Sequence, residues 1–320
     1  MTGSGKHVVI IVSAGRTGTR FFGDFLSSMV PGSHSVHEPD VFEGFTRRTW
    51  ERVRTFGIYH MVLGRLFKTT GLRHLSEGFL GGSLELERLI EALARQRLPY
   101  YEGLAADPII ESYYQWYGIL PALPRVFPLY KVLATVRDPR AWVTSWMSFG
   151  AHHGPRDLVR KLGFRRLDPA MVGDAALAES WPEMSRFERL CWTWRTVNGL
   201  ILDFVDRDPN ARLWRYEDLF LSEARERHLE EMLVFLTRFP DRDFGFVPDP
   251  ALLGRRVHAS RPAGFPNWPD WSEVQARQLD GLCGPLMRRL GYGEETDWRA
   301  KLGLASAAAD PRGEVLTGRL

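Results

Sequence analysis

Cysteine is almost absent from this sequence. The 320 residues include only Cys191 and Cys283. Two cysteines cannot build a disulfide framework, and their separation matches no metal-binding spacing. Both lie among apolar neighbours, where a buried, unreactive thiol is the usual state. The cysteine content therefore excludes disulfide-stapled scaffolds and cysteine-ligated metal domains.

Long apolar runs are also absent. The longest aliphatic run near the start, Val8–Val12, is far too short to span a bilayer. The N-terminal residues lack a basic segment followed by a longer apolar stretch, so no secretory signal is visible. We therefore expect a soluble, cytoplasmic chain without stable membrane insertion.

The sequence carries little excess charge of either sign. Its formal net charge is +3 and its isoelectric point is near 8.9. This mild basicity suits an anionic ligand, but it does not imply nucleic acid or a membrane as a partner. We expect no nucleic-acid partner, and the composition leaves the oligomeric state open.

Short apolar strands alternate with helices along the chain. A β-branched run at residues 7–12 predicts a buried parallel strand. Further strands are predicted at residues 131–136 and 211–216. The predicted helices are residues 19–29, 84–98, 138–146, 187–205, 222–237 and 272–290, the last with Ser272 as N-cap and Gly291 as C-cap. The alternation predicts an α/β fold with a doubly wound, mainly parallel sheet flanked by helices, and ligands at the carboxyl ends of the strands.

The domain organisation follows from the same pattern. We expect a single domain over residues 1–303, with a helical insert at about residues 40–105 after the first strand–helix unit. Residues 245–270 are rich in Pro and Gly and predict a loop. Residues 304–320 predict a flexible tail.

Residues 13–20 predict an anion site. A buried strand, a glycine-bearing turn and a helix N-terminus direct backbone N–H groups and the positive end of the helix dipole to one place. The glycines permit close backbone approach, and the other side chains add hydroxyl donors and positive charge. These residues are Gly15, Arg16, Thr17, Gly18, Thr19 and Arg20.

The same loop departs from an ATP-binding P-loop. If Gly18 is placed on the second glycine of that motif, Thr19 stands where the lysine belongs and Arg20 where the Mg²⁺-binding hydroxyl belongs. The run Gly3–Lys6 resembles half a P-loop, but it precedes the strand. These substitutions argue against a magnesium-dependent kinase or ATPase.

The run Arg16–Arg20 resembles the 5′-phosphosulfate-binding loop of PAPS-dependent sulfotransferases, in which Lys or Arg precedes a Ser/Thr-Gly-Thr/Ser run. By itself the run is also compatible with an ordinary glycine turn between strand and helix. The resemblance implies a P-loop NTPase-like fold, PAPS as donor, PAP as product and no metal. Within that family, the sequence resembles the carbohydrate-type and bacterial members more than the cytosolic small-molecule type.

A second motif is similar to the family's 3′-phosphate motif. There an arginine at a strand end and a serine eight residues later hold the 3′-phosphate, and here these are Arg137 and Ser145. A guanidinium suits bidentate phosphate contact, and Asp138-Pro139 suits a helix start. ATP lacks a 3′-phosphate, so this pair points to PAPS.

A third family feature is the run Tyr216–Leu219, whose tyrosine the resemblance places near the adenine. The alternative is that Tyr216 merely ends a strand and Asp218 caps the next helix. The family's C-terminal Arg-Lys-Gly signature is absent. The arginines that could replace its cation are Arg255, Arg256 and Arg261.

Sulfuryl transfer requires a cation at the leaving phosphate and a base at the acceptor. Arg16 occupies the position of the family's lysine and, because arginine stays protonated, predicts electrostatic stabilisation. The resemblance places a catalytic Glu, often before Pro, where Glu38 stands, and we favour it over His37. His152 and His153 are more remote alternatives.

The sequence thus predicts a sulfotransferase that acts on a hydroxyl, or less favourably an amine, of a carbohydrate, lipid or natural-product acceptor. A metal-dependent kinase and a non-catalytic nucleotide-binding protein are the alternatives. Aromatic residues abound between residues 50 and 117, but they do not identify the acceptor.

Overall fold

Five parallel strands form one central sheet in the computed structural model, which describes residues 5–41, 44, 46–157, 161, 166–254 and 264–304. In chain order the strands are β1 (Val8–Ser13), β2 (His34–His37), β3 (Ile109–Ser112), β4 (Tyr130–Val136) and β5 (Ala211–Arg215). Their spatial order is β2-β3-β1-β4-β5, and all four pairings are parallel. The carboxyl ends of all five strands therefore meet at one edge, with β1 in the centre.

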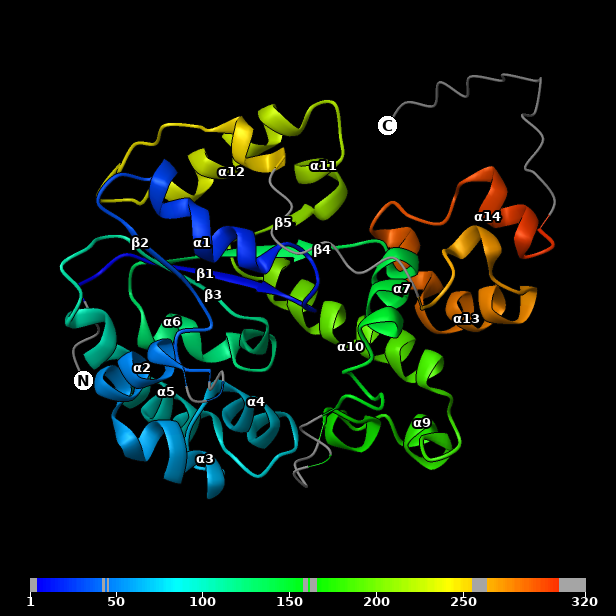
Figure 1. The fold of residues 1–320 in the computed structure, drawn as a ribbon, viewed down its shortest axis with the longest axis horizontal. Helices are drawn as coiled ribbons and strands as arrows, with labels where there is room; N and C mark the ends of the chain where they lie inside the picture. Colours follow the sequence, from blue (N-terminus) through cyan, green and yellow to red (C-terminus); the bar gives the residue numbers. More distant parts are fainter. Residues whose placement is uncertain are drawn as a thin grey trace, which may run out of the picture.

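Helices cover both faces of the sheet (Figure 1). Because side chains alternate along a strand, Val9 and Ile11 of β1 join one core, while Val8, Ile10 and Val12 join the other. On the first face lie α1 (Thr19–Met29), α11 (Tyr216–Phe220) and α12 (Arg225–Thr237). On the second lie α5 (Leu86–Glu102), α6 (Leu123–Val126) and α10 (Arg186–Val205). The predicted α/β class, a mainly parallel sheet flanked by helices, is confirmed.

The helix predictions agree closely with the structure. Helix α1 has the predicted bounds, α7 (Pro139–Phe149) runs one turn further than expected, and α12 begins three residues later. Helix α13 (Glu273–Arg289) begins with the predicted N-cap, Ser272, in a complete capping box. Gly291 follows the C-cap Leu290 and has a φ of 78°.

Strands β2 and β3 were not predicted as strands. Each has four residues, and polar side chains make up much of both, as in the sequence His34-Ser35-Val36-His37. Neither shows the continuous apolar run of β1 or the mostly apolar sequence of β4. The two strands form one side of the sheet, where β3 lies between β1 and β2.

Four helices lie among the described residues between β2 and β3. They are α2 (Arg47–Ile58), α3 (Gly64–Leu66), α4 (Leu72–Leu80) and α5, with a π-helical turn η1 (Tyr59–Leu63) before α3. We call residues 47–102 the insert. Its helices lie below the sheet on the left of Figure 1.

The remaining described segments are short. In the segment predicted as a loop, residues 250–254 and 268–270 form 3₁₀ turns, and residues 255–263 lie outside the described residues. The tail from residue 305 also lies outside them. Helices α9 (Ala175–Ser180) and α14 (Thr296–Lys301) complete the right side of Figure 1. Within the described ranges, no helix combines the length and apolarity that membrane crossing needs.

Both cysteines are free and buried. The Cys283 thiol donates to the Cys191 carbonyl oxygen at 3.2 Å, inside the contact between α10 and α13. The prediction of buried, inert thiols agrees with this packing.

Candidate functional site

The loop after β1 adopts the left-handed backbone that its glycines permit. Gly15 has a φ of 78°, Arg16 of 58° and Gly18 of 81°, after which α1 begins at Thr19. The amide groups of the first turn of an α-helix lack intrahelical acceptors, so this end of α1 offers donors to an anion. The non-glycine residue in this conformation, Arg16, is the predicted catalytic cation, and such outliers concentrate at functional sites.

Replacing Gly18 with alanine should damage this loop. A Cβ there would lie 2.9 Å from the Phe220 ring and would require an alanine at a φ of 81°. We expect a loss of roughly 1–3 kcal/mol in unfolding free energy. The control is Gly199→Ala inside α10, where a Cβ meets nothing within 4 Å. Thermal unfolding of both variants measures the effect. Equal melting temperatures would contradict the prediction that Gly18→Ala destabilises the loop.

Arg16, Arg137 and Ser145 meet beside the loop. The Arg16 Nε–H donates to Ser145 Oγ at 2.9 Å, and Arg137 Nη1–H donates to the Arg16 carbonyl oxygen at 3.2 Å. Ser145 lies in the second turn of α7 and is buried. The three residues come from the β1–α1 loop, the end of β4 and α7. The structure therefore brings together the side chains that the two sequence motifs singled out.

Two guanidinium groups in one half-buried place favour an anion between them. Burial, and then the charge of Arg137, lower the pKa of Arg16 below its ordinary value. Arginine nevertheless stays charged at neutral pH. The Arg137 Nε is buried and has no hydrogen-bond partner within the described part of the chain. A buried N–H without a partner costs free energy, which an anionic ligand would recover.

Indole and hydroxyl groups form hydrogen bonds with the β1–α1 loop and with the end of β4. Trp142 Nε1–H donates to the Gly15 carbonyl oxygen at 2.8 Å, and Trp194 Nε1–H donates to the Arg137 carbonyl oxygen at 2.9 Å. Thr135 Oγ1 donates to Thr17 Oγ1 at 3.1 Å. Both tryptophan side chains are fully buried. The sequence pattern predicts the places of these tryptophans in the helices but not their contacts with the two strand ends.

Tyr216 lies under the Arg137 guanidinium. Its ring centroid is 4.7 Å from Arg137 Cζ, and it stacks obliquely on Phe220 at 4.8 Å. The tyrosine opens α11 directly after β5. Asp218 lies within that short helix and pairs with Arg215 at 2.8 Å, so the alternative in which Asp218 caps a helix is wrong.

Asp138 is the predicted N-cap of α7, and its carboxylate accepts from the Arg140 N–H at 2.8 Å. Its own N–H donates to Glu217 Oε1 at 3.1 Å, and the Tyr292 hydroxyl donates to Glu217 Oε2 at 2.6 Å. Burial raises the pKa of Glu217 although these hydrogen bonds oppose the shift. The resulting chain of contacts ties the start of α7 to α11.

Glu38 follows β2 at the same edge of the sheet. Its N–H donates to the Ser112 carbonyl oxygen at 3.0 Å, which continues the β2–β3 ladder. Its φ is 47°, again in the left-handed region where non-glycine residues are uncommon. His37 Nε2 lies 3.9 Å from Glu38 Oε1, and both side chains are about one-fifth exposed. The two predicted base candidates are thus adjacent. Both lie at the carboxyl edge of the sheet, where the β1–α1 loop also lies.

A buried ionic network supports the turn after Glu38. Asp40 and Arg97 are fully buried and 3.2 Å apart, and His60 Nε2 lies 2.8 Å from the Asp40 carboxylate. Arg97 also pairs with the buried Glu111 of β3 at 3.1 Å. Burial would raise the pKa of Asp40, but Arg97, His60 and Arg65 hold it well below its ordinary value. This network, which the sequence analysis missed, joins the insert to the end of β2.

Arg20 and Thr19 occupy the first turn of α1. Arg20 Nε lies 3.7 Å from Asp24 Oδ2, and its side chain is 42% exposed. Arg255, Arg256 and Arg261 lie outside the described residues. In the described ranges, no three His, Cys, Asp or Glu side chains gather in an arrangement that could hold a metal ion.

His152 and His153 follow α7 rather than β2. The rings of His152 and Trp146 are 5.0 Å apart, and His153 is buried against Thr193 of α10. Burial, and then Arg166, lower the pKa of His152 well below its ordinary value. Burial, and then Arg73, lower the pKa of His74 to about 4.

These shifts predict acid sensitivity. His74 and His152 are neutral in the folded chain, but in the unfolded chain they bind protons near pH 6.5. Because the unfolded state then binds more protons, stability should fall as the pH drops from about 6.5 toward 4. We expect a lower melting temperature at pH 5 than at pH 7, and a smaller drop in His74→Gln. The control is His228→Gln, which removes a histidine on α12 beside Glu231. Identical drops in all three proteins would contradict the assignment.

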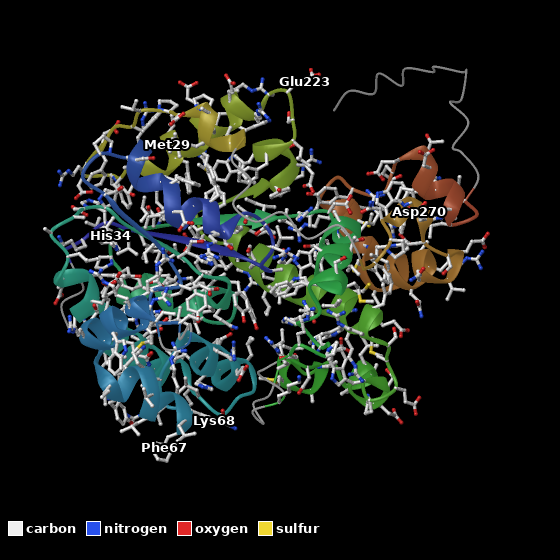
Figure 2. The ribbon with its side chains drawn as sticks, viewed as in Figure 1. Met29, His34, Phe67, Lys68, Glu223 and Asp270 are labelled. Carbon is white, nitrogen blue, oxygen red and sulfur yellow. The ribbon has the colours of Figure 1, made fainter. Side chains whose placement is uncertain are left out.

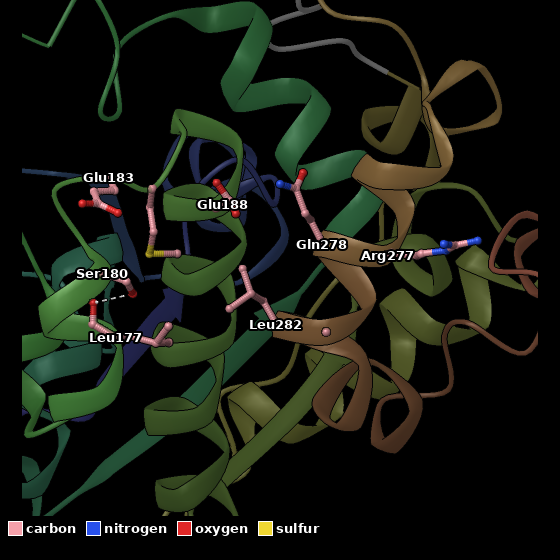
Figure 3. A pocket seen from close by; sticks show the side chains of 9 residues that line it. Leu177, Ser180, Glu183, Glu188, Arg277, Gln278 and Leu282 are labelled. Carbon is pink, nitrogen blue, oxygen red and sulfur yellow. Dashed lines mark hydrogen bonds between the residues drawn. The ribbon is translucent and has the colours of Figure 1, made fainter.

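A surface pocket of about 340 Å³ lies elsewhere, between α9, α10 and α13 (Figure 3). Its lining includes Leu177, Glu188, Gln278 and Leu282. Its lining contains no residue of the β1–α1 loop and neither Arg137 nor Glu38. The strand-end edge, rather than this pocket, therefore carries the convergent charged groups.

No family model matches the chain, and no curated protein matches it. Among solved structures it is similar to a sulfotransferase domain of the curacin biosynthetic pathway, with 16% identity over 91% of this chain and 99% of that chain and a TM-score of 0.46. It is also similar to a sulfotransferase domain of an olefin synthase from Synechococcus (17% identity, 88% of each chain, TM-score 0.42). A third is a sulfotransferase from Alicyclobacillus acidocaldarius (14% identity, 94% and 98%, TM-score 0.42). Similarity this weak does not by itself assign a function to the chain. The function must be argued from the residues of the site.

Proposed function

We propose that this chain is a PAPS-dependent sulfotransferase. The observation that carries the proposal is the convergence of Arg16, Arg137 and Ser145 at the N-terminus of α1. Two guanidinium groups and the free amides of a helix start suit a ligand with two separate anionic groups. PAPS has such groups at its 5′ and 3′ positions.

Each part of the site has a distinct task in donor binding. The loop of residues 13–20 holds the 5′-phosphosulfate through backbone N–H groups, hydroxyls and Arg16. Arg137 and Ser145 hold the 3′-phosphate, and the buried Arg137 Nε supplies a donor for it. The Tyr216 ring, already against Arg137, borders the adenine.

The transfer itself needs a base and a stabilised leaving group. An acceptor hydroxyl oxygen attacks sulfur, the bond from sulfur to the bridging phosphate oxygen breaks, and its electron pair stays on the phosphate of PAP. Arg16 stabilises the charge that develops on that oxygen, without giving up a proton. Glu38 takes the proton that the acceptor hydroxyl loses.

The geometry of the sheet suits this division of labour. Strand β3 separates β2 from β1, so the backbones of β2 and β1 run about 10 Å apart across the sheet. This spacing leaves room for a sulfuryl group and an acceptor oxygen between the end of β1 and the end of β2. His37 is the second candidate for the base, because its ring nitrogen lies beside the Glu38 carboxylate.

The acceptor is a hydroxyl, or less favourably an amine, of a carbohydrate, lipid or natural product. A sulfotransferase assay with isotopically labelled PAPS and a panel of these acceptors tests the activity. We expect labelled product with one acceptor class and none without enzyme. Stabilisation by PAP without transfer to any acceptor would instead favour a non-catalytic nucleotide-binding protein. Magnesium-dependent transfer of phosphate from ATP would favour the kinase alternative.

A further inference from the structure

Large apolar side chains concentrate on the outside of the insert. Across the described ranges, twelve large apolar side chains are exposed, and seven of them lie between residues 50 and 67. These seven are Trp50, Ile58, Tyr59, Val62, Leu63, Leu66 and Phe67. We call them the apolar ridge. Scattered exposed apolar residues need no explanation, but a contiguous group marks an interaction surface.

Six of the seven ridge residues lie in one short stretch after a kink at Gly57, whereas Trp50 lies before that kink on α2. Positions 58, 62 and 66 repeat at helical spacing, and so do 59, 63 and 67. The intervening His60 and Gly64 are buried against the protein. The outward half of this helical stretch is therefore apolar, opposite to the usual pattern of a surface helix. Figure 2 shows Phe67 at the outer margin of the insert, directed away from the ribbon.

Buried polar contacts anchor the segment that carries most of the ridge. His60 contacts Asp40 at 2.8 Å, and the Thr70 hydroxyl donates to the His60 carbonyl oxygen at 2.8 Å. Arg65 Nη2 donates to the Asp40 carbonyl oxygen. The inward face of the segment is thus anchored by charged and polar contacts, so its apolar outward face is a surface feature of the fold.

Basic residues border the ridge. Arg47, Arg48 and Arg54 are exposed on α2, before a kink at Gly57, and Lys68 is exposed directly after Phe67. The exposed acidic residue among them, Glu51, pairs with Arg47 at 3.1 Å. In Figure 2, Lys68 lies near Phe67 on the same margin. Exposed apolar and aromatic side chains with flanking arginine and lysine are the composition of helices that lie in a bilayer interface.

We propose that the apolar ridge docks onto the surface of an anionic lipid bilayer. Leu66 and Phe67 enter the boundary between headgroups and acyl chains, while Trp50 and Tyr59 lie at headgroup level, where amphipathic rings concentrate. The bordering arginines and Lys68 contact anionic headgroups, each contributing electrostatic attraction near the surface. The chain lies on the membrane without spanning it, and this binding does not depend on the proposed sulfotransferase activity.

The proposal is tested by co-sedimentation of the full chain with vesicles of phosphatidylglycerol and of phosphatidylcholine. We expect binding to phosphatidylglycerol that weakens as salt is raised, and much weaker binding to phosphatidylcholine. The double variant Leu66→Ser, Phe67→Ser should lose at least about tenfold in vesicle affinity. The double variant Arg48→Glu, Arg54→Glu should also bind more weakly. It should no longer prefer phosphatidylglycerol over phosphatidylcholine.

Leu221→Ser is the matched control, because Leu221 is 66% exposed but lies outside the ridge. It should bind vesicles like the unmodified chain, and all variants should keep their melting temperature because only exposed side chains change. Absence of vesicle binding, or equal binding of the ridge variant, would overturn the proposal. The proposal would also be overturned if light scattering shows a dimer, the ridge variant abolishes that dimer, and vesicles are not bound. The ridge would then join two copies of the chain.

Discussion

Glu38→Gln is expected to lower the turnover number by about 100- to 10,000-fold while PAP binding stays nearly unchanged. The substitution keeps the size and shape of the side chain but removes its capacity to take the proton of the acceptor hydroxyl. Glu38 lies at the end of β2, apart from the loop and the Arg137–Ser145 contact that would hold PAP. The measurement is kcat with labelled PAPS, beside the Kd for PAP from calorimetry.

Two companion variants make this test specific. Glu102→Gln removes an exposed carboxylate at the end of α5 and should leave kcat unchanged. His37→Gln removes the neighbouring ring, 3.9 Å from Glu38 Oε1. If His37→Gln loses turnover while Glu38→Gln keeps near-normal kcat, the base is His37. Near-normal kcat in both variants would contradict a base at this strand end.

Arg137→Ala is expected to weaken PAP binding by about 10- to 150-fold. Arg137 brings a charged fork-shaped donor, including a buried Nε, to the place where the 3′-phosphate would bind. Adenosine 5′-phosphosulfate lacks that phosphate, so its affinity should change far less. Calorimetric titration of both nucleotides measures the difference.

The control for charge is Arg212→Ala on β5, which removes an exposed arginine packed over Phe235. It should affect neither nucleotide. Equal losses of PAP and adenosine 5′-phosphosulfate in Arg137→Ala would remove the 3′-phosphate role, because the arginine would then act on a group that both nucleotides share.

The centre of the sheet was predictable because its signals are local. β1 is a continuous apolar run from Val8 to Val12, and β4 is apolar apart from Lys131 and Thr135. Each strand is followed by a recognisable break, the glycine turn of residues 13–18 and the Asp138-Pro139 pair. The order of strand, turn and helix then places Arg16 and Arg137 at adjacent strand ends. Their meeting with Ser145 was expected in outline, although the contact between Arg16 and Ser145 was not.

The β2 side of the sheet was not predictable in the same way. Glu111 is fully buried in β3. From the local sequence alone, a charged residue at this position predicts exposure to solvent. Its burial depends on Arg97, which reaches it from α5, and on the Tyr101 hydroxyl, which donates to its carboxylate at 2.8 Å. Such pairing joins residues that only the folded chain brings together. For the same reason, the indole donors of Trp142 and Trp194 could not be assigned to the loops they hold.

The central claim, a donor site for PAPS, is tested most directly by one binding comparison. Calorimetry in buffer with a chelator measures PAP, and a parallel titration measures ATP with Mg²⁺. We expect PAP to bind without added metal, at least about tenfold more tightly than Mg-ATP, since two arginine-bearing subsites act on its separate phosphates. Tighter binding of Mg-ATP, or a requirement for metal in PAP binding, would contradict a donor site built from Arg16, Arg137 and Ser145.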